Sequence, residues 1–152
     1  MLHGSLPDIF HPLIAQWFLS RYGTATQTQL KAWPQVAAGG HILICAPTGS
    51  GKTLAAFLWA LNRLIIGEWQ AGATRMVYIS PLKALNNDIQ RNLLTPLKEL
   101  EALFSGHGMA FPDITVHTRS GDTSAAERRR MLSNPPQILI TTPESLNLML
   151  SS

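Results

Sequence analysis

The feature that most constrains this chain is a glycine-rich loop set between an aliphatic run and an apolar helical stretch. The loop reads Ala46-Pro-Thr-Gly-Ser-Gly-Lys-Thr53, with the aliphatic run 41–45 before it and the helical pattern 54–66 after it. In a strand–loop–helix of this kind, successive backbone N–H groups converge on a phosphate at the positive end of the helix. The loop therefore predicts an α/β fold that binds a phosphorylated ligand.

Each residue type in this loop has a chemical use. Gly49 and Gly51 allow the backbone to curl around a phosphate. Lys52 can reach the terminal phosphates of a nucleotide, and the Thr53 hydroxyl can ligate Mg²⁺, so we assign catalytic roles to these two residues. The usual pattern begins with glycine where Ala46 stands, which leaves a simple glycine-rich turn as the alternative. The loop residues assigned to nucleotide binding are Thr48, Gly49, Ser50, Gly51, Lys52 and Thr53.

Strand and helix patterns alternate along the chain after residue 40. The strand candidates are the aliphatic and β-branched runs 41–45, 76–80, 114–118 and 138–142. Helical spacing of apolar residues occupies the intervals between them, at 54–66, 82–93, 97–104 and 124–132. Such alternation predicts a parallel sheet flanked by helices.

The helix boundaries carry local signals of their own. Two helical patterns precede the loop, at 11–21 and 27–33, and Pro34 is expected to interrupt the second. Three later helix starts are marked by capping residues, which are Thr95 before Pro96, Thr142 before Pro143, and the capping box of Ser124 with Glu127.

The composition is that of one globular domain. With 152 residues, 45% of them hydrophobic, and a formal net charge of +3, the chain can bury a core and has only a mildly basic surface. The single cysteine, Cys45, excludes an intrachain disulfide and is expected to be buried in its strand. The longest apolar run, 54–61, is far below the ~20 residues of a membrane-spanning helix. No signal peptide is recognised at the start, so we expect a cytoplasmic protein without membrane contact.

Five motifs in a fixed order indicate a family. They are Thr26-Gln-Thr-Gln29, the loop at 46–53, Ser80-Pro-Leu-Lys-Ala-Leu85, Arg119-Ser-Gly-Asp-Thr123 and Thr141-Thr-Pro-Glu-Ser-Leu146. In this order, from about Phe10 to Leu150, the chain resembles the first motor domain of superfamily 2 helicases of the DEAD/DEAH-box type. Within that superfamily it is most similar to the large helicase-related (Lhr) group.

The resemblance implies a RecA-like P-loop domain that is incomplete at its C-terminal side. Residues 1–40 would form a helical adenine-reading segment, and residues 41–152 would form the βα units. Gln29 matches the glutamine that reads the adenine edge, and either Phe10 or Tyr22 would cover the ring. A solvated helix residue is the alternative interpretation of Gln29.

The resemblance also implies a surface for the nucleic-acid backbone. The residues that match its three contact motifs are Pro81 and Lys83, then Arg119, Gly121 and Asp122, then Thr142, Pro143 and Glu144. The ligand would be a single-stranded or partly duplex nucleic acid, with DNA favoured over RNA. Asp122 could equally be a turn or cap residue. For the run Arg128–Arg130, a solvated face with one or two contacts is favoured over a phosphate track.

Two parts of such a motor are not found in the 152 residues. The family pattern continues with an Asp-Glu-x-His segment that holds Mg²⁺ and with a second RecA-like domain, and neither is present. The expected function is the ATP- and Mg²⁺-binding portion of an ATP-dependent helicase, with this chain alone inactive in hydrolysis. The alternative is a non-catalytic nucleotide-binding or nucleic-acid-binding remnant.

Overall fold

A parallel sheet of three strands forms the centre of the fold. The computed structural model describes residues 6–81 and 88–151, and its strands are β1 (Met76–Ile79), β2 (Val116–Arg119) and β3 (Ile138–Thr141). The strand order is β1-β3-β2, and Met76 and Val116 both pair with Ile138. The carboxyl ends of the three strands are therefore level, and the predicted parallel sheet is confirmed.

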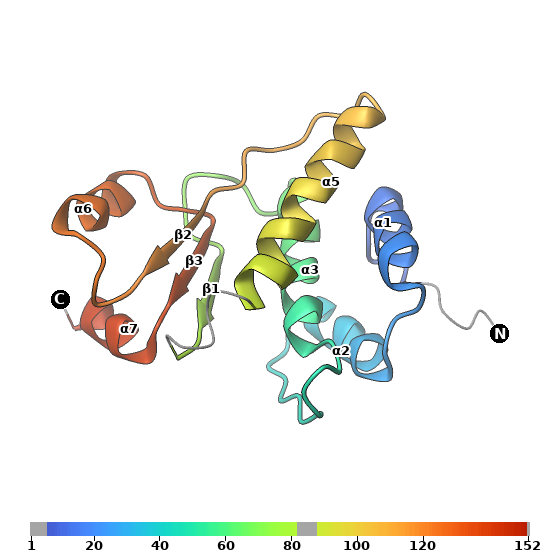
Figure 1. Ribbon diagram of the computed structural model, residues 1–152, viewed down its shortest axis with the longest axis horizontal. Coiled ribbons are helices and arrows are strands. Elements are labelled where there is room, and N and C mark those ends of the chain that lie inside the picture. The colour runs from blue at the N-terminus through green and yellow to red at the C-terminus, as the bar shows by residue number, and fades with distance from the viewer. Residues whose placement is uncertain (1–5, 82–87, 152) are drawn as a thin grey trace.

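Helices cover both faces of this sheet. Figure 1 shows α3 and α5 on one face and α6 and α7 on the other, with α1 and α2 forming an additional layer beyond α3 and α5. The helical segments are α1 (Pro12–Tyr22), α2 (Gln27–Ala37), α3 (Lys52–Ile65), the π-helical turn η2 (Gln90–Leu94), α5 (Thr95–Gly106), α6 (Ala125–Ser133) and α7 (Pro143–Leu150). Among the described residues, no helix is long and apolar enough to cross a membrane.

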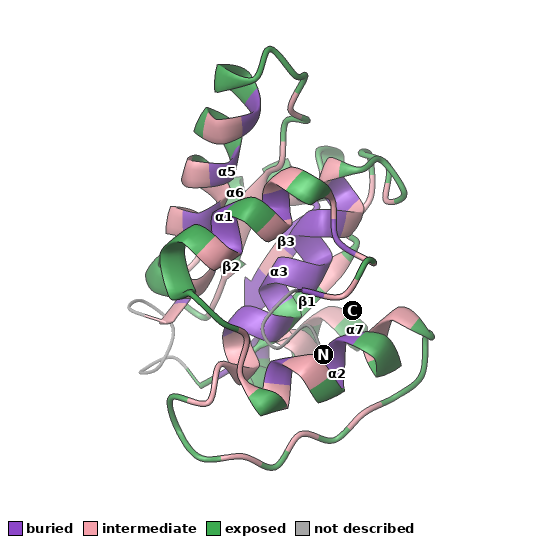
Figure 2. Ribbon diagram, turned by 90° about the vertical axis from the view of Figure 1, so that its right-hand side faces the viewer, coloured by how far each residue is buried: buried purple, intermediate pink, exposed green. Residues whose placement is uncertain are grey.

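The core is centred on α3. This helix is apolar on almost every side, and Phe57, Leu58 and Leu61 are fully buried. The ring of Phe57 lies 4.8 Å from that of Tyr78, which ties α3 to β1. On the opposite side the buried Trp33 indole donates a hydrogen bond to the Ala55 carbonyl at 3.0 Å, which ties α2 to α3. The helix that follows the phosphate-binding loop is thus held from two sides (Figure 2).

The predicted strand 41–45 is wrong for this structure. In the described part of the chain, residues 41–45 pair with no strand, and no residue from 38 to 50 is buried. Leu43 is 89% exposed, and Cys45 is exposed, contrary to the expected buried position. A strand forms only where a neighbouring backbone exchanges hydrogen bonds with it, and residues 41–45 pair with neither outer strand of the sheet, β1 or β2. The aliphatic pattern alone could not supply that neighbour.

One predicted helix end, at Pro34, and one predicted helix cap, at Thr95, are also wrong. Pro34 lies inside α2, which continues to Ala37. The neighbouring Trp33 is fully buried in the core. Thr95 makes no side-chain cap, because the helix runs into α5 from the π-helical turn η2. The N–H of Thr95 donates to the carbonyl of Gln90, five residues back, and this widened turn accommodates Pro96, which cannot join a regular helical ladder.

The other two capping predictions are confirmed. Ser124 and Glu127 form the reciprocal capping box at the start of α6. Thr142 accepts the N–H of Ser145 at the start of α7, with Pro143 in its first turn. Strand β2 begins at Val116, two residues later than the predicted run 114–118. Local capping chemistry was therefore predictable where no unusual turn intervened.

Candidate nucleotide and nucleic-acid sites

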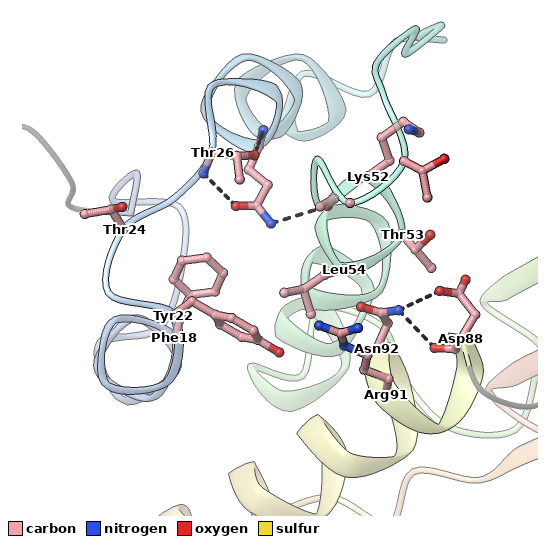
Figure 3. A pocket seen from close by; sticks show the side chains of 14 residues that line it. Phe18, Tyr22, Thr24, Thr26, Lys52, Thr53, Leu54, Asp88, Arg91 and Asn92 are labelled. Carbon is pink, nitrogen blue, oxygen red and sulfur yellow. Dashed lines mark hydrogen bonds between the residues drawn. The ribbon is translucent and has the colours of Figure 1, made fainter.

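A cavity of about 580 Å³ lies where the phosphate-binding loop meets α1, α2 and η2. Its walls come from segments that are far apart in sequence but packed together around the start of α3 (Figure 3). The lining residues are Phe18, Tyr22, Thr24, Thr26, Gln29, Thr48, Gly49, Gly51, Lys52, Thr53, Leu54, Asp88, Arg91 and Asn92. Most of the residues predicted for nucleotide binding therefore meet in one place.

The phosphate-binding loop has the backbone geometry that its glycines predict. Gly49 and Gly51 have φ values of +83° and +82°, in the left-handed region that side-chain-bearing residues rarely adopt. Gly51 is the N-cap of α3, so the first N–H groups of the helix and its positive dipole end face the loop. The Lys52 ammonium donates hydrogen bonds to the carbonyls of Ala46 and Pro47, the latter at 2.8 Å. The loop thus combines N–H donors with a lysine held across its own carbonyls.

Gln29 connects α2 to this loop. Its Oε1 accepts the N–H of Thr26 at 2.9 Å, and its Nε2 donates to the carbonyl of Gly51 at 3.3 Å. The Thr26 hydroxyl makes a second bridge by donating to the carbonyl of Ser50 at 2.8 Å. Gln29 is 3% exposed, so the interpretation as a solvated helix residue is wrong. Its amide still has a second N–H and a second oxygen lone pair for a ligand.

Gly51 is also where Gln29 approaches the loop most closely. A Cβ built on Gly51 would lie 2.3 Å from Nε2 of Gln29. The positive φ and this close approach both require glycine at the junction. The two predicted nucleotide-contacting elements are therefore packed against one another at a single residue.

The two aromatic candidates for covering a base differ in position. Phe10 is buried in the core with its ring 4.9 Å from that of Trp33. Tyr22 lines the cavity and is 37% exposed. The guanidinium of Arg21 lies 5.7 Å from the centre of the Tyr22 ring. Of the two candidates, Tyr22 is thus the one that lines the cavity.

An anchor on α5 holds the end of α1 that carries Tyr22. The carboxylate of Glu99 accepts hydrogen bonds from the Trp17 indole at 2.8 Å and from the Arg21 guanidinium. The Arg21–Glu99 pair is partly exposed, with 38% and 36% of the side chains accessible. The position of Tyr22 thus depends on a contact between helices about 80 positions apart in sequence.

The remaining wall of the cavity was missed by the sequence analysis. Asp88 accepts two hydrogen bonds there. The Asn92 amide donates to Oδ1 of Asp88 at 2.8 Å, and the Tyr78 hydroxyl donates to Oδ2 of Asp88 at 3.2 Å. Burial, and then the Asp88 charge, raise the pKa of Tyr78. Asp88, Arg91 and Asn92 have the i, i+3, i+4 spacing of one helix face, while Ile89 faces the core. This helical spacing is the sequence signal that could have identified Asp88, Arg91 and Asn92 as a shared surface.

A second group of predicted residues lies at the carboxyl edge of the sheet. The N–H of Ser80 donates to the carbonyl of Thr141 at 3.1 Å, and the Thr141 hydroxyl donates to the carbonyl of Arg119 at 2.8 Å. These bonds bring the ends of β1, β2 and β3 together. Pro81 follows β1 at this edge, and the buried Thr142 follows β3. Lys83 lies outside the described residues, as do the other residues of 82–87, the first part of the predicted helix 82–93.

The turns beyond this edge are open to solvent. Gly121 and Asp122 are exposed in the turn after β2, and Pro143 and Glu144 are exposed in the first turn of α7. Arg128 donates to the carbonyl of Gly121 at 2.9 Å, whereas the next two residues, Arg129 and Arg130, are exposed. Two of the three arginines thus face solvent, and contacts of 128–130 with a nucleic acid stay a prediction. Arg128 holds the glycine turn in place.

Comparison with known proteins agrees with this arrangement of loop, cavity and sheet edge. A family model described as DEAD/DEAH box helicase matches residues 26–152. The chain belongs to the DEAD/DEAH box helicase family. The predicted resemblance to the superfamily and its parallel α/β fold is thereby confirmed.

Individual helicases show the same relationship. The chain is 49% identical to "Lhr helicase/ probable uracil glycosylase" of Mycolicibacterium smegmatis over 94% of its length, and 44% identical to "ATP-dependent helicase Lhr-Core" of Methanocaldococcus jannaschii over 95%. It spans only 10% and 18% of those two relatives.

A solved structure supports the fold directly. The Mycobacterium smegmatis helicase Lhr, bound to ssDNA and AMP-PNP, superposes with a TM-score of 0.85 at 49% identity. The match covers 95% of this chain and 18% of that one. The described DEAD/DEAH box domain therefore has the RecA-like helicase architecture.

Proposed function

We propose that this chain is the ATP-binding and nucleic-acid-backbone-binding portion of an ATP-dependent helicase, with DNA favoured over RNA. The observation that carries the proposal is the cavity in which Gln29 of α2 is hydrogen-bonded to the phosphate-binding loop at Gly51. The Lhr structure with AMP-PNP and ssDNA supports the same assignment by similarity. The activity of a whole helicase is part of the proposal, since the chain spans a small share of its relatives.

The residues of the cavity fit a nucleoside triphosphate with Mg²⁺. Backbone N–H groups from Gly49 to Thr53 would hold the phosphates, and the Lys52 ammonium would exchange its carbonyl partners for phosphate oxygens. The Thr53 hydroxyl would ligate Mg²⁺, which neutralises phosphate charge when bound. Gln29 would bond the adenine edge with its unused N–H and lone pair.

The remaining residues of the proposed nucleotide site are Thr48, Ser50 and Tyr22. Thr48 and Ser50 flank Gly49 in the loop, and Tyr22, which lines the cavity, would cover the adenine ring. Residues 1–40 would act as the adenine-reading segment, and residues 41–152 as the βα units of the motor domain.

The carboxyl edge of the sheet is the proposed nucleic-acid surface. Exposed backbone N–H groups at a helix start and a glycine turn can approach phosphates closely, and such contacts do not read base identity. The affinity of this surface for a nucleic acid should therefore not depend on the base sequence. The proposed contacts are Pro81, Lys83, Arg119, Gly121, Asp122, Thr142, Pro143 and Glu144.

Nucleotide binding is tested by calorimetric titration of ATP into the wild type and Lys52→Ala. Losing a charge-assisted phosphate contact should cost about 1.5–3 kcal/mol, or roughly ten- to hundredfold in affinity. Lys98→Ala, an exposed lysine on α5, serves as the matched control and should bind ATP as the wild type does. Equal ATP affinity in wild type and Lys52→Ala would refute the proposed site.

Nucleic-acid binding is tested by its dependence on salt. Each phosphate contact with a single strand contributes about 0.7 to the slope of log affinity against log salt concentration. Lys83→Ala should reduce both the affinity for an oligonucleotide and that slope, while Lys98→Ala should change neither. An unchanged slope in Lys83→Ala would remove that residue from the surface.

Turnover separates the proposal from a second possibility, that the 152 residues hydrolyse ATP by themselves. An acidic metal ligand and a second domain's arginine are both needed for fast phosphoryl transfer, and an arginine finger alone is worth about 10³–10⁵ in rate. We expect no nucleic-acid-stimulated hydrolysis above that of Lys52→Ala. Stimulated turnover that vanishes in Lys52→Ala would show that a catalytic acid lies within these residues.

A further inference from the structure

We propose that Arg128 is a positioning residue of the nucleic-acid surface, which holds the peptide unit between Gly121 and Asp122 with its N–H facing solvent. A phosphate of the nucleic-acid backbone would then accept that N–H. This inference rests on the proposed function, because it concerns the turn after β2 that is part of the proposed surface. It adds a side chain that lies in none of the five sequence motifs and that acts through the turn rather than on the nucleic acid.

The turn after β2 is closed by two hydrogen bonds of its own. The Ser120 N–H donates to the Thr123 hydroxyl at 2.8 Å, and the Thr123 N–H donates to the Ser120 carbonyl at 3.2 Å. Gly121 and Asp122 are the two central residues, both exposed and neither at a positive φ. A turn with this closing bond can also adopt a form in which the central peptide unit is reversed. The two bonds therefore close the turn without fixing which way its central peptide unit faces.

Arg128 holds this peptide unit from α6. Its Nη2 atom donates to the carbonyl of Gly121 at 2.9 Å. The Arg128 side chain is half-buried, and its Nε is buried without a hydrogen-bond partner in the described part of the chain. The guanidinium is therefore packed against the turn instead of extending into solvent. Because the donor is charged, its hydrogen bond is stronger than one between neutral groups.

The start of α6 directs Arg128 at the turn. Ser124 is the N-cap, and its hydroxyl accepts the N–H of Glu127 at 3.3 Å in the capping box. The Arg128 N–H donates to the Ser124 carbonyl at 3.0 Å. Side chains of a helix lean toward its N-terminus, and the turn lies directly before the N-cap. The backbone of Arg128 is thus fixed, and its side chain extends back to the turn that it bonds.

The bond to Gly121 decides which group the turn offers to a ligand. In a planar trans peptide unit the C=O and N–H groups point in opposite directions. Because the Gly121 carbonyl points at Arg128, the N–H of Asp122 points away from it, on the exposed side of the turn. An outward N–H is a donor for a phosphate oxygen, whereas the reversed unit would present a carbonyl oxygen, which repels an anion. Gly121 has open space where a Cβ would lie, so a phosphate can come close.

The inference is tested by titrating a single-stranded oligodeoxynucleotide into the wild type, Arg128→Ala and Arg128→Lys at several salt concentrations. Arg128→Ala should weaken binding about two- to tenfold, the value of one hydrogen bond, at every salt concentration. The slope of log affinity against log salt concentration should stay at the wild-type value, because no contact between a cation and a phosphate is lost. Arg128→Lys retains a cationic donor for the Gly121 carbonyl and should recover most of the affinity.

Arg75→Ala is the matched control for these titrations. Arg75 is an exposed arginine that also donates to a backbone carbonyl, that of Gln70 at 3.0 Å. It directly precedes β1, so it lies at the opposite edge of the sheet from the turn. Arg75→Ala removes the same charge and the same kind of hydrogen bond, and it should bind the oligonucleotide as the wild type does.

A second measurement follows the backbone amide signals of Asp122 and Ser145 by nuclear magnetic resonance. In Arg128→Ala the Asp122 signal should move in the free protein, because its peptide unit is no longer held. The shift of that signal on adding the oligonucleotide should also be smaller than in the wild type. Ser145, in the first turn of α7, should respond to the oligonucleotide as in the wild type.

The outcomes separate this inference from the proposed function. Wild-type affinity in Arg128→Ala, when the wild type binds the oligonucleotide, would overturn the role of Arg128 alone. A slope lowered by about 0.7 in Arg128→Ala would also overturn it, because Arg128 would then bind a phosphate itself. Loss of the Ser145 response in Arg128→Ala would overturn it too, since the substitution would have disturbed the whole edge. If the wild type does not bind the oligonucleotide, the proposed nucleic-acid surface fails, and this inference fails with it.

Discussion

The proposed nucleotide cavity and the carboxyl edge of the sheet are assembled in different ways. The cavity is braced by side chains: Gln29 bonds Gly51, Thr26 bonds Ser50, and Glu99 anchors the end of α1. The edge is aligned by strand pairing, which brings Ser80, Thr141 and Arg119 to one level. Its turns beyond the strands remain exposed.

This difference predicts different responses to substitution. In the cavity, side chains that hold the fold also line the space proposed for the nucleotide, so a change there should affect stability and ATP binding together. At the sheet edge the backbone is held by the strands, and an exposed turn residue can be changed with little effect on the fold.

The largest effect is expected from the two glycines that represent the two regions. Gly51→Ala must place a Cβ at positive φ and 2.3 Å from Nε2 of Gln29, which should cost about 1–3 kcal/mol of stability and weaken ATP binding at least tenfold. Gly121→Ala has open space around its Cβ and should change stability by less than about 0.5 kcal/mol. Chemical denaturation and ATP titration measure both. Equal losses in the two variants would contradict the contrast.

An intermediate effect is expected from the anchor of α1. Glu99→Gln removes the charge that holds Trp17 and Arg21, and should cost about 0.5–1.5 kcal/mol of stability, reduced by its partial exposure. ATP affinity should fall a few-fold because Tyr22 is held less firmly. Glu101→Gln, an exposed acid on the same helix, is the control for both measurements. If Glu99→Gln loses stability but binds ATP normally, Tyr22 does not depend on this anchor.

The smallest effect is expected on the sheet side, in the capping box of α6. Hydrogen bonds from Ser124 lower the pKa of Glu127. A carboxyl whose pKa is lowered by folding stabilises the fold above its ordinary pKa, and this contribution disappears as the pH falls. Glu127→Gln should therefore melt slightly below the wild type at neutral pH and equal to it in acid. A melting difference that persists below the carboxyl pKa would contradict this origin.

Sequence reasoning succeeded where the signal is local. The phosphate-binding loop, the capping box of Ser124 and the cap of Thr142 each depend on a few consecutive residues, and the structure has all three. The parallel sheet followed from the alternation of strands and helices. In each case the physical cause lies within one segment or in the order of segments.

It failed where the cause lies in packing between segments. The run 41–45 has a strand-like pattern, but it pairs with no strand among the described residues. Thr95 begins α5 but does not cap it, because the chain enters this helix from the π-helical turn η2, and the sequence has no simple pattern that indicates such a turn. Arg91 was overlooked because it joins the cavity only when η2 packs against α3. Its spacing from Asp88 was visible, but the neighbour across the cavity was not.

The most direct test of the account is a map of backbone and side-chain amide signals by nuclear magnetic resonance during titration of the 152-residue chain. We predict that ATP with Mg²⁺ shifts the amide signals of Gly49 to Thr53 and the side-chain NH₂ of Gln29, and leaves those of Gly121 and Ser145 unchanged. A single-stranded oligonucleotide should shift the second set. Shifts at the sheet edge with ATP, or no shift in the phosphate-binding loop and Gln29, would contradict the assignment of two separate sites.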